Sequence, residues 1–457
     1  MAGPSSVGTQ LVFTSQPVSV DAGETIAPPV IVQIRDSHGT LVSDADGPVT
    51  IALGTNAAGA SLAGTTTVTA AHGVATFDDL WLNQPGTAYT LVATSGTLTE
   101  ATSSPFTISL IFLAVSAGAD HSCSLNTGGL AYCWGSNAYG QLGDGTTTSR
   151  TKPVVVTGGL RFKSIVTGDY FTCGLTIAGA GYCWGYNFDG ELGDSTKTGR
   201  TSPKAVVGGL VFSTLGPARG YTVCGTTTDA AAHCWGRDPL GDSTVTSRSA
   251  PVLVSGGLSF QSVATGYDHS CGVTTGGSAY CWGENLYGQI GDGTGVTRLT
   301  PKLVATSVSV GTVSAAEFDG CSVGSDHAGY CWGDDTDGED GDNSTNVNRL
   351  SPVSVYGAVQ FLSISTGDQF TCGLTTTRAA YCWGQNTNGQ VGSGASGADM
   401  PSPVLVGGGL SFSSISAGGS HACGVSAGAL YCWGLNASGQ LGDGTTTNRA
   451  GPVKASP

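Results

Sequence analysis

The stretch Tyr132-Cys-Trp-Gly-Ser-Asn-Ala-Tyr-Gly-Gln-Leu-Gly-Asp-Gly-Thr146 returns almost unchanged as Tyr431-Cys-Trp-Gly-Leu-Asn-Ala-Ser-Gly-Gln-Leu-Gly-Asp-Gly-Thr445. Its Cys-Trp-Gly core occurs seven times, with cysteines at positions 133, 183, 234, 281, 331, 382 and 432. The steps between them are 50, 51, 47, 50, 51 and 50 residues. A fixed period of this length is typical of proteins that stack one small structural unit. No such string precedes residue 111, so the chain has a non-repeated part and a repeated part.

A second cysteine precedes each Cys-Trp-Gly string by ten residues, or by nine in the last repeat. The segment Cys123–Cys133 alternates apolar residues around central glycines, which predicts a β-hairpin with its loop at 127–129. In such a hairpin the two cysteines face each other closely enough to form a disulfide. The shorter last pair keeps this facing with a two-residue loop, Ala427-Gly428. Buried free thiols and zinc are the alternatives, although structural zinc sites usually contain C-x2–4-C pairs.

We therefore predict a disulfide in every repeat: Cys123–Cys133, Cys173–Cys183, Cys224–Cys234, Cys271–Cys281, Cys321–Cys331, Cys372–Cys382 and Cys423–Cys432. Such bonds persist in oxidising compartments, which predicts a secreted or cell-surface protein. The start, Met1-Ala-Gly-Pro, shows no signal peptide, so we expect an export signal to have been removed.

The composition excludes several classes of protein. There are 32 Asp and Glu residues against 17 Lys and Arg, for a net charge of −15, which argues against nucleic acid as a partner. No apolar run reaches 18 residues, so no membrane-inserted helix is expected. The 73 glycines lack a G-X-Y period, which excludes collagen.

The non-repeated part divides into an expected frayed end, 1–8, and an all-β domain, 9–110. Short β-rich segments separated by turn signals predict about seven strands, which suggests a two-sheet sandwich with Phe77 and Trp81 in its core. The expected strands are Gln10–Thr14, Val30–Arg35, Val49–Leu53, Thr66–Thr69, Gly73–Phe77, Tyr89–Ala93 and Pro105–Ser109.

The repeated part, 111–457, is expected to contain about four short strands in each unit of about 50 residues, which is the pattern of a propeller blade. Seven blades would close into a ring without free sheet edges. The predicted fold class is all-β, a seven-bladed β-propeller preceded by an immunoglobulin-like β-sandwich.

Two resemblances refine this expectation. Part of the non-repeated sequence resembles bacterial immunoglobulin-like domains of surface and secreted proteins. The segments that carry this resemblance are Leu11-Val-Phe-Thr-Ser-Gln-Pro17, Gly73-Val-Ala-Thr-Phe77 and Tyr89-Thr-Leu-Val-Ala-Thr-Ser95. The repeated W-G-x-N-x-x-G-Q-L-G string resembles the regulator of chromosome condensation repeat family over about 345 residues. That family implies a seven-bladed propeller. Its founding member is an exchange factor for a nuclear GTPase, and one secreted bacterial member inhibits β-lactamases by binding them with a propeller face.

This sequence departs from the nuclear member through its paired cysteines and its lack of a basic tail, so exchange activity is not expected. Two repeats also depart from the common pattern. The third, Cys234-Trp-Gly-Arg-Asp-Pro-Leu-Gly241, lacks the Asn-x-x-Gly-Gln segment, and the fifth has Asp340 in the leucine position.

The variable positions inside the repeat are the candidates for binding. They follow Trp-Gly (Tyr139, Tyr186, Phe188, Arg237, Leu286, Tyr287, Asp335, Asn388) or precede the hairpin (Asp120, Tyr170, Arg219, Tyr267, Phe318, Gln369). If both loops lie on one rim, their aromatic tips form a patch suited to protein recognition. The predicted binding residues are Tyr139, Tyr170, Tyr186, Phe188, Tyr267, Tyr287 and Phe318.

The invariant features are interpreted as structural. The seven tryptophans are expected to pack in the core because their spacing is regular, although a ring of tryptophans could also stack sugars or a peptide. His121, His269 and His421 are expected to pack there too, because Phe171 and Phe370 replace histidine in other repeats. The aspartate after Gly-Gln-Leu-Gly is expected to accept backbone bonds in a turn. Catalytic motifs, a cofactor and a metal site are not predicted. A calcium role stays open for the acidic residues Asp334, Asp335, Asp337, Glu339, Asp340 and Asp342, which lack EF-hand spacing.

The leading hypothesis is a non-enzymatic, secreted or cell-surface protein whose propeller face binds a protein or glycan, with the sandwich as spacer. The alternatives are a self-associating subunit of an extracellular array or filament, and a hydrolase with a His/Asp/Glu cluster in the propeller channel.

Overall fold

The computed structural model describes residues 7–216 and 218–456, and every named element in them is a β-strand. The expected frayed end at 1–8 therefore falls mostly outside the described residues. The chain divides into two compact units. The first holds the residues up to Ile111 together with Asn126–Leu130, and the second holds Phe112–Leu125 and the residues from Ala131 on. None of the described residues forms a helix with the length and apolarity needed to cross a bilayer.

The first unit contains small sheets with the strand orders β1-β3-β7, β11-β10-β4-β6, β2-β12-β9 and β5-β8. The strands are β1 (Gln10–Ser15), β2 (Val20–Asp21), β3 (Val30–Arg35), β4 (Pro48–Leu53), β5 (Leu62–Ala63), β6 (Thr67–Thr69), β7 (Val74–Phe77), β8 (Trp81–Leu82), β9 (Gly86–Tyr89), β10 (Leu91–Thr94), β11 (Ala101–Thr102) and β12 (Phe106–Ser109).

Alternating burial along these strands builds one core. In β3, Val30, Val32 and Ile34 are buried and the residues between them are not, as expected for a sheet with one packed face. The expected strand Tyr89–Ala93 is in fact the end of β9 and most of β10, which belong to different sheets. Phe77 is buried as expected, but Trp81 is only half-buried.

The second unit contains seven four-stranded antiparallel sheets among the described residues, each formed from consecutive strands. Sheet 1 has β13 (Phe112–Ala117), β14 (His121–Asn126), β15 (Ala131–Gly135) and β16 (Arg150–Val155). Sheet 2 has β17 (Phe162–Thr167), β18 (Phe171–Thr176), β19 (Gly181–Gly185) and β20 (Arg200–Ala205). Sheet 3 has β21 (Phe212–Leu215), β22 (Thr222–Thr227), β23 (Ala232–Gly236) and β24 (Arg248–Leu253). Sheet 4 has β25 (Phe260–Thr265), β26 (His269–Thr274), β27 (Ala279–Gly283) and β28 (Arg298–Leu303).

Sheet 5 has β29 (Val310–Ala315), β30 (Asp319–Gly324), β31 (Gly329–Gly333) and β32 (Arg349–Ser354). Sheet 6 has β33 (Phe361–Thr366), β34 (Phe370–Thr375), β35 (Ala380–Gly384) and β36 (Met400–Leu405). Sheet 7 has β37 (Ser414–Ala417), β38 (His421–Ser426), β39 (Ala429–Gly434) and β40 (Arg449–Lys454).

The cysteine prediction is confirmed in all seven sheets. In sheet 1 the hairpin of β14 and β15 places Cys123 opposite Cys133, and the last hairpin, one residue shorter, still places Cys423 opposite Cys432. The Cα atoms of the seven pairs lie 4.0–4.1 Å apart, and the sulfur atoms are bonded. No cysteine of the described residues is free, so the thiol and zinc alternatives do not apply.

The glycine after each tryptophan ends the hairpin strand in a conformation that other residues avoid. Gly135 has a φ of 101°, and a Cβ atom there would lie 2.5 Å from the carbonyl oxygen of Asp120. The strand therefore requires glycine at the point where it turns away from its partner.

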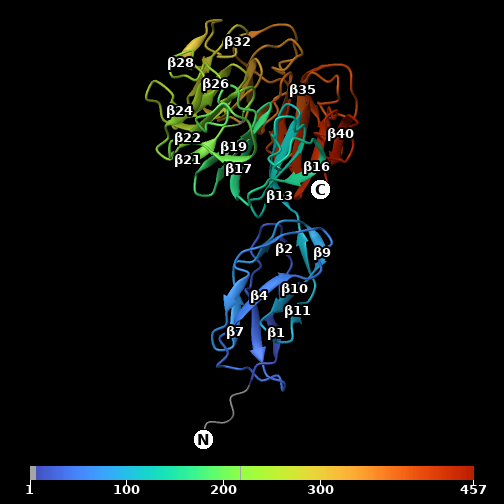
Figure 1. Cartoon of the computed structure of the whole chain (residues 1–457). Coiled ribbons are helices and arrows are strands. Elements are labelled where there is room, and N and C mark those ends of the chain that lie inside the picture. The colour runs from blue at the N-terminus through green and yellow to red at the C-terminus, as the bar shows by residue number, and fades with distance from the viewer. Residues whose placement is uncertain (1–6, 217, 457) are drawn as a thin grey trace. The chain divides into compact units, whose positions relative to one another are not determined.

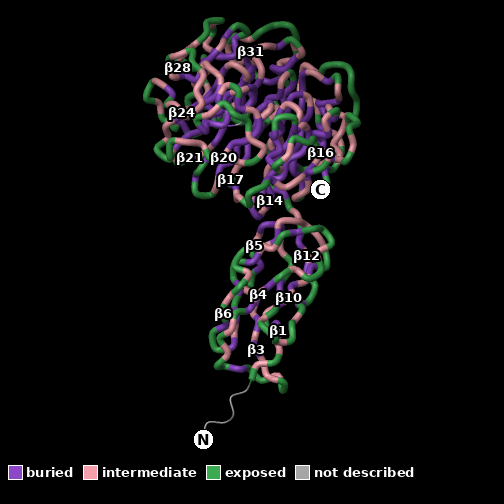
Figure 2. The backbone as a smooth tube through the Cα atoms, viewed as in Figure 1, coloured by how far each residue is buried: buried purple, intermediate pink, exposed green. Residues whose placement is uncertain are grey.

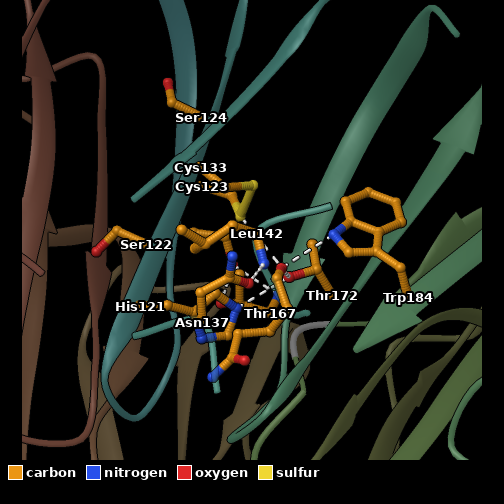
Figure 3. The surroundings of a disulfide bond; sticks show 12 residues. His121, Ser122, Cys123, Ser124, Cys133, Asn137, Leu142, Thr167, Thr172 and Trp184 are labelled. Carbon is orange, nitrogen blue, oxygen red and sulfur yellow. Dashed lines mark hydrogen bonds between the residues drawn. A yellow bond between two sulfur atoms is a disulfide. The ribbon is translucent and has the colours of Figure 1, made fainter. Parts of the chain in front are cut away.

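Neighbouring sheets are joined through the tryptophans. Trp184 of sheet 2 packs in one core cluster with Cys123, Cys133 and Leu142 of sheet 1. Its indole N–H donates to the carbonyl oxygen of Gln141 at 2.9 Å. Figure 3 shows Thr172 and Trp184 facing the loop that carries Leu142. A side chain at Gly143 would meet this indole ring at 2.6 Å, which explains the second glycine of the motif.

The same bond joins the first and last sheets, because the Trp134 indole donates to the carbonyl oxygen of Gln440 at 2.8 Å. The Ser122 hydroxyl also lies 2.8 Å from Nε2 of His421. Strands β13 and β37 are in contact, and Figure 1 shows the teal strands of sheet 1 beside the red strands of sheet 7. Figure 2 shows that the burial lies mainly in the strands and the exposure in the loops.

The two irregular repeats leave polar groups unpartnered inside the core. Sheet 3 lacks the Asn-x-x-Gly-Gln segment, and the indole nitrogen of the next tryptophan, Trp282, has no hydrogen-bond acceptor. In sheet 5, Asp340 is fully buried, and neither of its carboxyl oxygens has a hydrogen-bond partner.

Candidate functional site

Two loops of each sheet lie together at one end of its strands. In sheet 2 the backbone N–H of Tyr186, the residue after Trp-Gly, donates to the carbonyl oxygen of Tyr170, the residue before the hairpin. The same bond recurs in every sheet: Ser136 to Asp120, Arg237 to Tyr221, Glu284 to Asp268, Asp334 to Phe318, Gln385 to Gln369 and Leu435 to Ser420. The variable positions of the repeat thus lie side by side.

A buried polar network holds the loop after Trp-Gly in place. The amide nitrogen of Asn137 donates to the carbonyl oxygens of Thr146 and Thr148, and its oxygen accepts from the backbone N–H of Leu142. Asp144 accepts from the Thr146 backbone N–H at 2.9 Å, as expected for a turn. Such networks order a loop because each polar group is satisfied.

Asp144 also binds the Arg150 guanidinium through Nε and Nη2, a contact that the sequence interpretation missed. Equivalent ion pairs join Asp194–Arg200, Asp242–Arg248, Asp292–Arg298, Asp342–Arg349 and Asp443–Arg449. The sixth repeat has Ser393 and Met400 at these two positions. A paired loss of this kind is the signal that could have revealed the contact.

Five of the seven predicted binding residues form one continuous aromatic surface. The ring centroids of Tyr139 lie 5.4 Å from Tyr170 and 5.0 Å from Tyr186, and Phe188 lies 6.4 Å from Tyr186. Tyr267 joins them through Tyr221. We call the set the aromatic surface: Tyr139, Tyr170, Tyr186, Phe188, Tyr221 and Tyr267.

Tyr221 was not among the predicted residues. Its ring lies 5.8 Å from Tyr186, 6.2 Å from Tyr170 and 5.5 Å from Tyr267. The other two predicted residues, Tyr287 and Phe318, form a separate pair with centroids 4.8 Å apart. Phe188 and Tyr139 are the most exposed members of the aromatic surface, at 66% and 47%.

Two assignments of loop positions were wrong. Arg219 was expected on the rim, but an extra residue in the third repeat moves Tyr221 into the position equivalent to Tyr170, and Arg219 is 4% exposed. Asp335 was expected at a loop tip, but it is fully buried because it occupies the position of Asn137. It accepts hydrogen bonds from the Asp340 backbone N–H and the Ser344 hydroxyl.

Four acidic residues in the loops before the hairpins interact electrostatically with one another. Burial raises the pKa values of Asp120, Asp169 and Glu317. The pKa of Asp368 rises to about 7, chiefly through loss of hydration, while the Arg219 charge opposes the rise. Carboxyl groups from sheets 1, 2, 5 and 6 therefore share a region in which carboxylate charge is costly.

Arg219 lies at the centre of this acidic region. Its Nη2 donates to the carbonyl oxygen of Ala417 in sheet 7, and its Nη1 lies 3.9 Å from Oδ1 of Asp368 in sheet 6. Sheet 3 thus provides one cation that reaches two distant sheets and offsets part of the negative charge.

Two cavities lie among the innermost strands. One, of about 20 Å³, is lined by Arg219 with alanine, serine and threonine side chains from six sheets. The other, of about 190 Å³, is lined by valine, isoleucine and serine, including Val115, Ile165 and Ile415. No carboxylate or imidazole is among the described residues that line either cavity, so neither has the cluster that a hydrolase would need.

The histidines at the repeated position are buried. Nε2 of His121 lies 2.9 Å from the Thr172 hydroxyl in the next sheet. Burial lowers the pKa values of His121 and His421 to about 3 and that of His269 to about 4, so all three are neutral. His121 and His421 join neighbouring sheets through Thr172 and Ser122, and none of the three histidines is exposed to a substrate.

Two glutamates replace the motif glutamine. Glu191 and Glu339 are buried and each accepts a backbone N–H bond, at 3.0 and 2.7 Å. Burial raises their pKa values to about 7 and about 8. Over the described residues, no group of three or more His, Cys, Asp or Glu side chains is arranged to hold a metal ion, and this includes the acidic loop of sheet 5.

Two family models, both described as the regulator of chromosome condensation (RCC1) repeat, match the repeated part of the chain. One matches residues 128–175, 276–329, 379–425 and 427–457, and the other 112–141, 162–191, 260–289, 361–390 and 412–440. Together these matches cover more than half of the chain.

Solved structures show the same fold. The yeast RCC1 protein Prp20, solved bound to Kap60, aligns with a TM-score of 0.64 at 19% identity, over 76% of this chain and 85% of that one. A structure of Prp20p from Saccharomyces cerevisiae, described with its binding to Gsp1p and histones, has the same score and identity over 76% and 88%. Human WBSCR16 aligns with a TM-score of 0.64 at 18% identity, over 72% and 94%. The likeness is to RCC1-like propellers and concerns the fold alone.

Proposed function

The chain belongs to the RCC1 repeat family, and from that membership we propose that it is a non-enzymatic protein that binds another protein with the aromatic surface. The observation that carries the proposal is the convergence of six aromatic side chains from four successive sheets, above loops that are fixed by buried hydrogen bonds. Tyrosines on a rigid support contribute large contact areas at low entropic cost.

The proposal includes a finer description of the architecture. We take the seven sheets as the blades of one closed propeller, which the contact of β13 with β37 and the bond from Trp134 to Gln440 support. We take residues 9–110 as an immunoglobulin-like sandwich of the bacterial type that serves as spacer, with 111–457 as the propeller.

A secreted or cell-surface location completes the proposal. Seven disulfides support it, because bonds of this kind are rare where glutathione keeps thiols reduced. The absence of carboxylates and imidazoles among the described residues that line the two cavities supports a role without catalysis.

Affinity capture tests the proposal. The immobilised wild-type chain is exposed to extracellular fluid of the source cells, beside a triple variant Tyr139→Ala/Tyr186→Ala/Phe188→Ala. We expect a protein that the wild type retains and the triple variant loses. The matched control is Tyr356→Ala, because Tyr356 is 57% exposed but follows the end of β32 that lies away from Gly333. Equal capture by wild type and triple variant, or none by either, would refute this function.

A further inference from the structure

The aromatic surface already holds one guanidinium group of its own. The Arg237 guanidinium lies 5.6 Å from the ring centroid of Tyr221 and 5.5 Å from that of Tyr267. Its Nε lies 3.6 Å from Oδ1 of Asp268. Aromatic rings attract cations over their faces, and a carboxylate at the edge adds charge pairing. The junction of sheets 3 and 4 is thus a cation site occupied by the chain itself.

The junction of sheets 1 and 2 has the same parts without the cation. Ser136 occupies the position after Trp-Gly that Arg237 occupies in sheet 3. Tyr139, Tyr170 and Tyr186 stand there with ring centroids 5.0–6.3 Å apart.

Two aspartates lie in the loops that carry these rings. Asp169 directly precedes Tyr170, and the carbonyl oxygen of Asp120 accepts the N–H of Ser136. The pKa of Tyr170 is raised chiefly by burial and also by the charges of Asp169 and Asp120. The Asp120 carboxylate accepts a hydrogen bond from the Gln440 side-chain amide at 3.3 Å. The junction therefore offers aromatic faces and carboxylates, and the described loops that carry these rings contain one basic residue, the exposed Lys197.

We propose that Tyr139, Tyr170 and Tyr186, with Asp120 at their edge, bind an arginine or lysine side chain presented by the protein partner. This inference rests on the proposed function and specifies the chemistry of the partner, which carries a basic residue at the centre of its contact surface.

Charge complementarity favours a basic partner over a neutral one. In the described loops of this face, the basic residues are Lys197, Arg219 and Arg237, and the two arginines are engaged within the chain. Acidic residues are frequent in the same loops, and the whole chain carries a net charge of −15. A field of this sign speeds the approach of a positively charged surface. A neutral glycan would gain the ring contacts but nothing from the carboxylates.

The experiment uses small probes on the full chain with 13C-labelled tyrosine rings. Nα-acetyl-argininamide is titrated while the ring signals are followed by NMR, and Nα-acetyl-citrullinamide, which has the same shape without the charge, is the paired control. Signals are assigned with single Tyr→Phe variants. We expect saturable shifts at Tyr139, Tyr170 and Tyr186, at least fivefold weaker binding of the citrulline probe, and no shift at Tyr356.

Variants separate the parts of the site. Asp120→Asn should weaken the arginine probe several-fold and reduce its dependence on salt, Tyr139→Leu should weaken it, and Tyr139→Phe should retain it because the ring face remains. Equal shifts from both probes, shifts from maltose instead of arginine, or none at these rings would overturn the inference. A partner captured by the aromatic surface without an arginine response would leave the proposed function standing. An arginine response without any captured partner would refute that function and leave the cation site.

Discussion

Replacing Asp340 with leucine should stabilise the protein. Five of its six counterparts, Leu142, Leu192, Leu240, Ile290 and Val391, pack in core clusters beside the tryptophan of the next sheet. Asp340 is fully buried at this position, and both of its oxygens lack hydrogen-bond partners. Leucine has the same number and branching of heavy side-chain atoms as aspartate, so the substitution changes polarity with little change in shape.

The magnitude follows from the polar group that is removed. A buried polar group without a partner costs about 1–3 kcal/mol, and burying two methyl groups in place of two oxygens adds about 1 kcal/mol. The variant Asp340→Leu should therefore be more stable by about 2–4 kcal/mol at pH 7. A cooperative unit of roughly 350 residues has an unfolding entropy of about 0.7 kcal/mol/K, so the thermal midpoint should rise by about 3–6 °C.

The gain should depend on pH in a defined direction. Burial and neighbouring carboxylates raise the pKa of Asp340 well above its usual value. A group with a raised folded-state pKa contributes its stability below the unfolded pKa, about 4, and loses it as the pH rises. The wild type is thus penalised most at high pH, and the gain from leucine should grow from pH 4 to pH 8.

Scanning calorimetry of wild type, Asp340→Leu and Asp340→Asn between pH 4 and 8 measures this. Asparagine removes the titration of residue 340 but keeps unpartnered polar atoms, so it should reduce the pH dependence of stability with a smaller gain. A lower midpoint for Asp340→Leu at pH 7, or a gain that does not change with pH, would refute the reasoning.

Three further outcomes are expected. Titration of Glu339 should lower the stability of the wild type by about 1–2 kcal/mol between pH 6.5 and 8, because burial raises the pKa of this group to about 8. Glu339→Gln should therefore reduce the fall measured by calorimetry by this amount, and an unchanged slope would contradict it. Removing one disulfide with Cys423→Ala/Cys432→Ala should lower the free energy of unfolding in urea by about 2.6 kcal/mol, the loop-closure value for a nine-residue separation. A loss below about 0.5 kcal/mol would contradict this. Trp282→Phe should lower the free energy of unfolding by about 1 kcal/mol less than Trp184→Phe does, because of these two indole N–H groups only that of Trp184 has an acceptor. Equal losses of stability would show that this hydrogen bond contributes nothing.

The features that the sequence predicted well are local ones. The length of the hairpin alone predicts that the two cysteines of a repeat face each other. The last hairpin tests this prediction, because both its loop and its cysteine spacing are one residue shorter, and Cys423 still faces Cys432. The glycine after each tryptophan follows from a backbone conformation that lies within one strand. Such features need no knowledge of which repeats are neighbours.

The features that were missed depend on contacts between segments. Tyr221 was not predicted because the third repeat has one extra residue before the hairpin. Arg219 was therefore aligned with Tyr170 in place of Tyr221. Asp335 was assigned to the surface because its equivalence to the buried Asn137 was overlooked. The meeting of Tyr139 with Tyr186 depends on the spacing of adjacent sheets, which no single repeat encodes.

Every sheet of the second unit is formed from consecutive strands, and among the residues that the structure describes no strand is exchanged between sheets 1 and 7. The seam between them is held by the same lateral contacts as the other junctions, such as the bond from Trp134 to Gln440. A single duplication or deletion in the gene could therefore add or remove one complete four-stranded sheet, here called a module, without changing the strand pairing in any other sheet. For the same reason, circularly permuted chains that begin at a different module should preserve every strand pairing.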